Sequence, residues 1–172
     1  FAEASGTPLF RGALGDVAGR LHAAATASGA EALVRVNGDS PLLDPRLVSR
    51  AVALYRARPV DLVTNVLPRS FPKGQSVEVI ATASLGRVLD ETDDPEDREH
   101  VTRYVYRNPD RFTIAGFQAD APRPQMQLSV DTAADFAFAE RLLRHLPADG
   151  PPAAVDALAE LAERLGAEAP SA

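Results

Sequence analysis

The segment Val34–Leu42, with the sequence VRVNGDSPL, indicates the fold class of this 172-residue chain. It begins as a short apolar run typical of a strand and ends in a dense turn signal of Asn, Gly, Asp, Ser and Pro. Two residues after it, Asp44 is placed to be the N-cap of a helix whose first residue is Pro45. The segment therefore predicts a strand, a turn and a helix in succession, with Asp39 in the turn.

The same order recurs along the chain. Strands are expected over 7–10, 32–36, 61–65, 76–81, 112–117 and 127–130. Helices are expected over 16–28, 45–58, 82–89, 132–146 and 154–165, with a further one ending near 107–109. Strands that alternate with helices of about ten to fifteen residues predict an α/β fold with a mainly parallel sheet. In such sheets ligands bind beyond the carboxyl ends of the strands, so chemistry is sought there.

Composition limits the class of protein. Hydrophobic residues make up 45% of the chain and charged residues 24%, which is ordinary for a globular domain. We expect residues 1–150 to form a portion of one domain and residues 151–172 to add a C-terminal helix and tail. The chain contains no cysteine, which excludes disulfides, a zinc-thiolate site and a cysteine nucleophile, and which fits a cytoplasmic protein.

Charge and hydropathy exclude further classes. The net charge of −6 argues against binding to nucleic acid, which favours basic surfaces. No apolar run approaches the length of about 18 residues that a membrane span needs. We therefore expect neither a nucleic acid nor a membrane among the partners.

Two acidic residues come within three positions of the ends of expected strands. Asp39 follows the strand over 32–36, and Asp131 follows the strand over 127–130. Carboxylates at neighbouring strand ends could converge on one Mg²⁺, which typically takes one or two carboxylates together with phosphate and water. The alternative is that Asp39 or Ser40 caps one helix, and that Asp131 or Thr132 caps the next.

The segment Arg98–Thr102 (REHVT) places His100 in a charged run close to a loop. A histidine there could orient a substrate hydroxyl or accept its proton. The alternative is a structural histidine. The glycines at 12, 15 and 19 match neither the dinucleotide-binding fingerprint nor the P-loop.

Taken together and in order, these segments resemble the cytidylyltransferase family of the spore coat polysaccharide biosynthesis protein F type. That family is related to the acylneuraminate and 3-deoxy-manno-octulosonate cytidylyltransferases. The resemblance covers about residues 9–146. It rests on LFRG (9–12), DV (16–17) with GR (19–20), VRVNGDSPLLDP (34–45), TN (64–65), PR (68–69), PKG (72–74), VEV (77–79), REHVT (98–102), YRNP (106–109) and VDTAAD (130–135).

The resemblance implies a Rossmann-like, three-layer nucleotide-diphospho-sugar-transferase fold. It implies transfer of a cytidylyl group from CTP to a sugar, giving a CMP-sugar and pyrophosphate, for surface or spore-coat polysaccharide. It also implies that Asp39 and Asp131 bind Mg²⁺ and that His100 takes part in catalysis. Substrate-binding residues are expected at Arg35, Asn37, Asn65, Arg69, Lys73, Glu78 and Glu99.

The family's chain opens with a strand and a Gly-rich, basic loop that grips the triphosphate, and residues 1–172 do not include such a segment. We therefore expect an N-terminally truncated domain with little activity as this chain alone. One alternative is a non-catalytic remnant or assembly module, and a homodimer stays open. A metal-dependent glycosyltransferase is a third reading, which the lack of an Asp-x-Asp signature near Asp39 disfavours.

Overall fold

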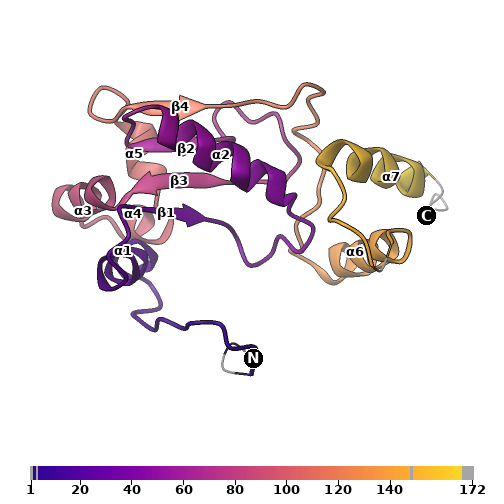
Figure 1. Cartoon of the computed structure of the whole chain (residues 1–172), viewed down its shortest axis with the longest axis horizontal. Helices are drawn as coiled ribbons and strands as arrows, with labels where there is room; N and C mark the ends of the chain where they lie inside the picture. Colours follow the sequence, from indigo (N-terminus) through magenta and orange to yellow (C-terminus); the bar gives the residue numbers. More distant parts are fainter. Residues whose placement is uncertain (1, 3, 148, 168–172) are drawn as a thin grey trace. The chain divides into compact units, whose positions relative to one another are not determined.

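The computed structural model describes residues 2, 4–147 and 149–167 (Figure 1). Its helices are α1 (Val17–Ala27), α2 (Pro45–Ala57), α3 (Thr82–Glu91), α4 (Pro95–Glu99), α5 (Arg103–Arg107), α6 (Ala133–Arg144) and α7 (Val155–Ala167). Its strands are β1 (Ala32–Arg35), β2 (Leu62–Thr64), β3 (Glu78–Ala81) and β4 (Ile114–Gly116). The bounds predicted for five helices and four strands agree with those observed to within two residues at each end. These elements are α1, α2, α3, α6, α7 and β1 to β4.

The chain folds as two compact units. The first consists of the residues up to Leu33, together with Val60–Leu62 and Val79–Ile114. The second consists of Val34–Pro59, Val63–Glu78 and the residues from Ala115 onward. The predicted fold class, α/β, is confirmed by this alternation of helices and strands.

The strands form one four-stranded sheet in the order β1-β3-β2-β4. Along β2 and β3, the N–H of Ala81 donates to the carbonyl of Asp61, whereas the N–H of Asn65 donates to the carbonyl of Val77. Residue numbers therefore rise on one strand as they fall on the other, so β3 runs antiparallel to β2.

Strands β2 and β4 run parallel, because Leu62 N–H donates to Thr113 and Phe117 N–H donates to Thr64. The sheet is thus mixed, and the prediction of a mainly parallel sheet needs correction at β3. The physical reason lies in the connection: no helix separates β2 from β3, whereas a parallel crossover usually carries one.

The predicted strands over 7–10 and 127–130 are wrong. Residues 7–10 form no strand, and over 127–130 only Gln127 pairs, in an isolated parallel bridge with Lys73. The bridge is closed by the N–H of Lys73, which donates to Met126, and by the N–H of Leu128, which donates back to Lys73. These two hydrogen bonds pair the backbone of Lys73 with that of residues 126–128, but no further bridge follows between these described segments, so no regular strand forms.

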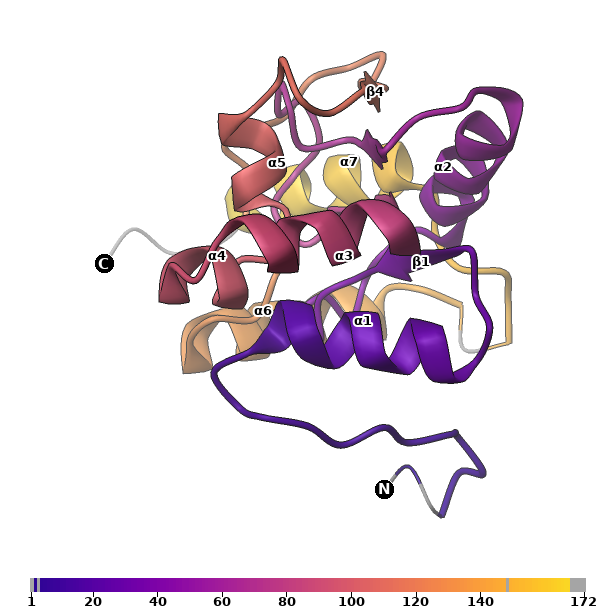
Figure 2. The same ribbon diagram turned by 90° about the vertical axis from the view of Figure 1, so that its left-hand side faces the viewer.

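In the first unit, helix α1 packs on α3 and α4 (Figure 2). Asp16 caps α1 by accepting a 2.8 Å hydrogen bond from the N–H of Gly19. The core of this unit is apolar and is formed by Ala18, Leu62, Ile80, Leu85, Val88, Val101, Val105 and Phe112. Burial of such side chains is the main favourable contribution to the stability of a unit of this kind.

In the second unit, α6 packs on α7 (Figure 1). Their apolar faces share a core with the loop after β1, formed by Leu42, Leu128, Ala139, Leu142, Leu158, Leu161, Ala162 and Leu165. Asp44 caps α2 and also accepts a 3.0 Å bond from the N–H of Val155, the first residue of α7. The start of α2 is therefore fixed to the start of α7. None of the helices in the described residues is long and apolar enough to cross a membrane.

Candidate functional site

Asp39 lies in an exposed turn after β1. The N–H of Ser40 donates to the carbonyl of Asn37 at 3.3 Å, and its hydroxyl donates to Oδ1 of Asp39 at 2.9 Å. The cap of α2 is Asp44, whose side chain accepts from the N–H of Arg46. The prediction that Asp44 caps this helix is confirmed, and the alternative that Asp39 or Ser40 caps it is wrong.

Asp131 precedes α6 but does not cap it. The cap is Thr132, which forms a capping box with Asp135: the hydroxyl of Thr132 accepts from the N–H of Asp135, and the Asp135 carboxylate accepts from the N–H of Thr132. Oδ2 of Asp131 instead accepts hydrogen bonds from Nε2 of Gln127 at 2.6 Å and from the hydroxyl of Ser129 at 3.3 Å. The helix-cap alternative therefore holds for Thr132 and fails for Asp131, whose side chain is exposed.

The positive charge of Lys73 influences Asp135 at the start of α6. The hydrogen bond from the Thr132 hydroxyl is the main cause that holds the pKa of Asp135 below its ordinary value, against the opposing effect of burial. The backbone N–H groups of Thr132 and Asp131 and the positive charge of Lys73 lower the pKa of Asp135 further. The chain's single lysine thus lies within electrostatic reach of the start of α6.

Backbone hydrogen bonds bring three segments of the second unit together. The N–H of Val130 donates to the carbonyl of Asp39 at 2.8 Å, which joins the turn after β1 to the segment that enters α6. Lys73 forms the bridge to that same segment through Met126 and Leu128, each at 2.9 Å. The structure therefore brings the backbone of Asp39, Lys73 and the segment before Asp131 into one place.

Close approach at Lys73 depends on the glycine after it. Gly74 has a φ of +89°, in the region that side-chain-bearing residues rarely adopt. A Cβ at this position would lie 2.6 Å from the carbonyl carbon of Leu128 and from the N of Ser129. The glycine of the PKG motif (72–74) is therefore needed because a larger residue would overlap the backbone of Leu128 and Ser129.

Arg35 and Glu78 pair with each other. Nη1 of Arg35 lies 2.6 Å from Oε2 of Glu78, and the glutamate side chain is 3% exposed. A buried carboxylate needs a charged partner, because burying an unpaired charge carries a large desolvation free energy. Their predicted contacts with substrate stay predictions.

Asn65 is buried, and both ends of its carboxamide bind backbone. Nδ2 donates to the carbonyl of Gln75 at 2.7 Å, and Oδ1 accepts from the N–H of Val77 at 2.8 Å. Arg69 is exposed and donates to the hydroxyl of Ser76 at 3.3 Å. These contacts show Asn65 holding the loop before β3, while its predicted substrate contact, like those of Arg69 and of exposed Asn37, stays a prediction.

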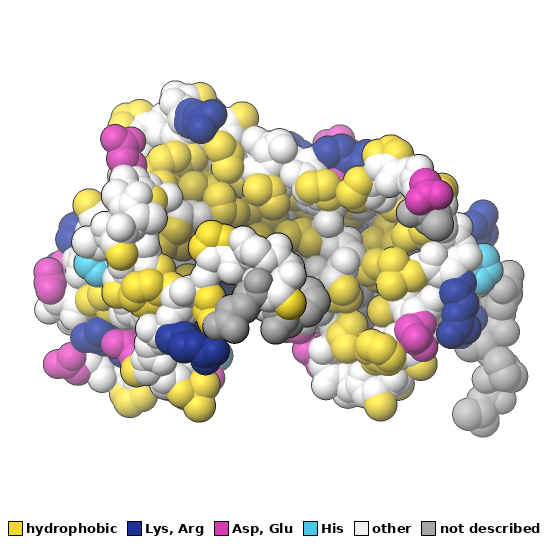
Figure 3. Space-filling view, turned by 60° about the horizontal axis from the view of Figure 1, so that its bottom comes forward, with side chains coloured by type: hydrophobic (Ala, Val, Ile, Leu, Met, Phe, Trp, Pro, Cys, Tyr) yellow, Lys and Arg dark blue, Asp and Glu magenta, His cyan; other side chains and the backbone are white. Residues whose placement is uncertain are grey.

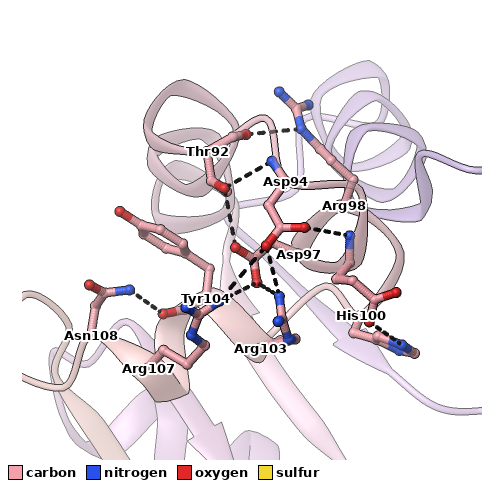
Figure 4. A network of polar contacts seen from close by, with 10 residues as sticks. Thr92, Asp94, Asp97, Arg98, His100, Arg103, Tyr104, Arg107 and Asn108 are labelled. Carbon is pink, nitrogen blue, oxygen red and sulfur yellow. Dashed lines mark hydrogen bonds and ion pairs between the residues drawn. The ribbon is translucent and has the colours of Figure 1, made fainter.

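Glu99 and His100 lie in the first unit, whereas the other predicted site residues lie in the second. His100 ends α4, where its N–H donates to the carbonyl of Glu96. Its Nε2 lies 3.7 Å from Oε2 of Glu96, and its side chain is 58% exposed (Figure 4). Both Glu99 and His100 are therefore solvent-accessible in this unit.

An ion pair between buried Asp97 and half-buried Arg103, which the sequence did not reveal, supports this segment. Asp97 is 2% exposed and accepts from Nη1 of Arg103 at 2.5 Å and from the hydroxyl of Thr92 at 3.1 Å (Figure 4). Arg103 also bridges to Asp94, the cap of α4, at 3.2 Å, which raises the pKa of Arg103. The turn that carries His100 is thus closed between α4 and α5 by charge-assisted hydrogen bonds.

Sequence reasoning also missed Gln75, which is fully buried. Its only signal is its place between the PKG motif and β3. Burial of an isolated polar side chain depends on tertiary partners, which periodicity does not show.

Large hydrophobic side chains are exposed in both units. Figure 3 shows hydrophobic side chains on one face of the molecule, with charged groups scattered between them. On α6, Phe136 is 57% and Leu143 is 51% exposed, and their spacing of seven residues places them on one side of the helix. In the first unit, Leu14 is 89% exposed.

The described residues contain no cluster of three or more histidine, cysteine or acidic side chains that could hold a metal ion. The second unit therefore offers the two exposed carboxylates of Asp39 and Asp131 rather than a complete protein cage. This donor set is oxygen only, which suits a hard cation that takes its other ligands from substrate and water.

Asp39 lies beyond the end of β1, and in open α/β sheets ligands bind beyond the carboxyl ends of the strands. Residues 6–164 match the cytidylyltransferase family, so this chain belongs to that family. It is also 30% identical, over 144 residues, to an uncharacterised protein of Methanocaldococcus jannaschii. That match covers 81% of this chain and 57% of the relative, so the chain spans just over half of that protein's length.

Two solved structures share the fold. A cytidylyltransferase from Leptospira borgpetersenii serovar Hardjo-bovis superposes with a TM-score of 0.90 at 23% identity, covering 96% of this chain and 70% of the other. A CMP:2-keto-3-deoxy-manno-octonic acid synthetase complexed with CTP gives a TM-score of 0.60 at 16% identity, covering 83% of this chain and 75% of the other. At these identities the likeness concerns the fold.

Proposed function

We propose that this protein transfers a cytidylyl group from CTP to a sugar hydroxyl, forming a CMP-sugar and pyrophosphate. Membership of the cytidylyltransferase family supports the reaction class. The single structural observation that carries the proposal is the bond from Val130 to Asp39, which sets the segments of Asp39 and Asp131 side by side. Lys73, on the bridge to the same segment, adds a positive charge where a triphosphate would lie.

The reaction is an in-line displacement at the α-phosphorus. The sugar oxygen forms a bond to that phosphorus, while the bond to the β-phosphate oxygen breaks and its electron pair leaves with pyrophosphate. The hydroxyl proton needs an acceptor, and His100 is the residue of this chain that we assign to the task. Positioning and neutralisation of charge carry most of the catalysis in such transfers.

We assign Asp39 and Asp131 as the residues that would hold Mg²⁺. Their two carboxylates fit this ion, which is bound through one or two carboxylates plus substrate phosphates rather than by a protein cage. When bound, the ion neutralises negative charge on the phosphates. Ser40 and Gln127, which donate hydrogen bonds to these carboxylates, orient them from within the protein.

The remaining assignments concern binding of the substrates. Lys73 is assigned to phosphate, since an ammonium group is a common point charge for that ligand. We assign the sugar and base contacts to Arg35, Asn37, Asn65, Arg69, Glu78 and Glu99. The neighbouring octonic acid synthetase is complexed with CTP, which supports CTP as the donor and a sugar acid as the acceptor. Surface or spore-coat polysaccharide is the proposed destination of the product.

The experiment is release of pyrophosphate by the full-length product of the gene. CTP, UTP, ATP and GTP are each offered with a panel of sugar acids and neutral sugars, with and without Mg²⁺. The proposal expects release only with CTP, an accepted sugar and Mg²⁺ together. Equal release from all four nucleotides, or transfer without any sugar, would contradict it.

The second candidate function is a non-catalytic assembly module, and the exposed apolar side of α6 favours it. Phe136 and Leu143 would be covered by a partner, of which a second copy of the chain is the simplest. Sedimentation of the parent and of the Phe136→Ser, Leu143→Ser double variant tests this. Dissociation of a parent dimer in the variant supports assembly, and a monomeric parent excludes the homodimer.

A further inference from the structure

The side chain of Gln75 binds the backbone just before the start of α2. Its Oε1 accepts a 2.9 Å hydrogen bond from the N–H of Asp44, and its Nε2 donates a 2.8 Å hydrogen bond to the carbonyl of Leu42. The Gln75 residue is 0% exposed. Both of its partners belong to the short segment that connects Asp39 to the helix, so Gln75 restrains the turn that carries Asp39.

A second buried carboxamide holds Gln75 from the other side. Asn65, at the end of β2, donates to the carbonyl of Gln75 and accepts from the N–H of Val77. The two side chains therefore form a continuous chain of hydrogen bonds from β2 through Gln75 to the start of α2. Satisfied buried polar networks of this kind fix a unique local arrangement.

The same loop carries the bridge to the third segment. Lys73 pairs with Gln127, and Gly74 lies directly against the backbone of Leu128. Gln75 follows these two residues, so one short stretch contacts both the segment before Asp131 and the segment after Asp39. A shift of this stretch would move Lys73 relative to Asp39.

We propose that Gln75 is a positioning residue of the candidate site, which fixes the Asp39 turn against Lys73 and the segment before Asp131. This inference rests on the proposed function, because it assigns Gln75 to the same site. Gln75 acts through the backbone that it binds and does not contact the reacting atoms.

A carboxamide is the group that this position requires. Amide nitrogen donates and amide oxygen accepts, so one side chain satisfies both a carbonyl and an N–H. An ionised glutamate keeps the acceptor for Asp44 and loses the donor for Leu42, while methionine, which has a similar shape, leaves both buried groups unpaired. Gln75→Glu therefore removes one of the two side-chain hydrogen bonds, and Gln75→Met removes both.

The test compares Gln75→Met and Gln75→Glu with a matched control, Ser70→Ala, in the full-length gene product. Ser70 is also buried in the second unit, and its hydroxyl accepts a 2.9 Å bond from the N–H of Ala119, which is not part of the Asp39 turn. Two readouts are taken: amide hydrogen exchange between Asp39 and Asp44, and the separate values of kcat and KM for cytidylyl transfer. Exchange reports the turn directly and does not depend on catalysis.

We expect Gln75→Met to speed exchange of these amides by at least ~10-fold, and Ser70→Ala to leave it within about 2-fold. We expect Gln75→Met to lower kcat by ~10- to 100-fold with a smaller change in KM, since misplacement of about 1 Å costs rates of that order. Gln75→Glu should speed exchange and lower kcat at least as much as Gln75→Met, because its buried carboxylate would have no charged partner and would face the carbonyl of Leu42.

If exchange and kcat of Gln75→Met match those of Ser70→Ala, the inference is wrong. If the parent itself releases no pyrophosphate, the proposed function fails, and the exchange measurement still decides whether Gln75 fixes the turn. Unchanged exchange together with reduced kcat would also overturn the inference, because Gln75 would then act by another route.

Discussion

The N–H of Val130 donates a 2.8 Å hydrogen bond to the carbonyl oxygen of Asp39. Through this bond the turn after β1 lies against the segment that enters α6, although the two are far apart in the sequence. Each segment presents one exposed aspartate that caps no helix. The assignment of Asp39 and Asp131 to a shared ion depends on this contact.

Asp39→Asn and Asp131→Asn should each lower kcat/KM by at least ~100-fold, since loss of a charge that holds a metal ion costs several kcal/mol of transition-state stabilisation. Neither residue caps a helix, so each change in Tm should stay within about 2–4 °C. Steady-state kinetics and thermal melting measure both effects. Asp120→Asn, at another exposed aspartate of the second unit, is the control and should behave as the parent. Near-parent rates in both test variants would mean that the ion binds elsewhere.

Gly74→Ala should destabilise the protein by about 2–4 kcal/mol, because it combines strain at positive φ with overlap against the backbone of Leu128. Gly29→Ala is the matched control. Gly29 has a φ of +66° but nothing within 4 Å of the added Cβ, so only strain of about 1–2 kcal/mol is expected. Denaturant unfolding measures both values. Equal losses for the two variants would show that the close approach at Gly74 is not required.

Asp97 and Arg103 should show strong energetic coupling. A double-mutant cycle with Asp97→Asn and Arg103→Met should give a coupling free energy of about 1–3 kcal/mol, since Asp97 is buried and loses the nearer of its two arginine partners, the other being Arg107 at 3.7 Å. The pair Glu140 and Arg144, 3.7 Å apart on the surface of α6, is the control and should give less than about 0.5 kcal/mol. A coupling free energy no larger than that of the control would show that the pair of Asp97 and Arg103 does not stabilise the turn that carries His100.

Asp44 should make stability depend on pH in the acid range. Burial raises the pKa of Asp44, but hydrogen bonds from the Arg46 side chain and from the N–H groups of Arg46 and Val155 outweigh it, so the pKa lies below its ordinary 3.8. A lowered native-state pKa stabilises the protein above the unfolded-state value and loses that contribution as pH falls below about 4.

The measurement is the free energy of unfolding of the parent and of Asp44→Asn between about pH 2.5 and 6. The advantage of the parent should be largest near the upper end and should shrink as the pH falls below about 4. A difference that is constant over the whole range would show that the charge of Asp44 is not the cause.

Local sequence signals predicted the helices well. Asp44 with Pro45, and Thr132 with Asp135, are caps formed by residues close together in the chain, so their geometry depends little on the rest of the fold. Strand direction was harder to predict. The antiparallel course of β3 follows from the connection after β2, which alternation within the strand does not reveal.

The candidate site was predicted in part. Acidic side chains after apolar runs pointed to Asp39 and Asp131, and the contact from Val130 places their segments together. Gln75 and Asp97 escaped notice because their burial is created by partners elsewhere in the fold. A polar residue that is buried through such partners looks like any surface residue in the sequence.

Paramagnetic Mn²⁺, which takes the same oxygen ligands as Mg²⁺, tests the central claim most directly. Substoichiometric Mn²⁺ is added to isotope-labelled parent, Asp39→Asn and Asp131→Asn proteins, and broadening of backbone amide resonances is followed by NMR. If the two aspartates hold one ion, amides at 38–40 and 130–132 broaden first in the parent, and both sets lose their broadening in either variant. Broadening of one set that survives loss of the other aspartate, or broadening centred elsewhere, would contradict the shared site.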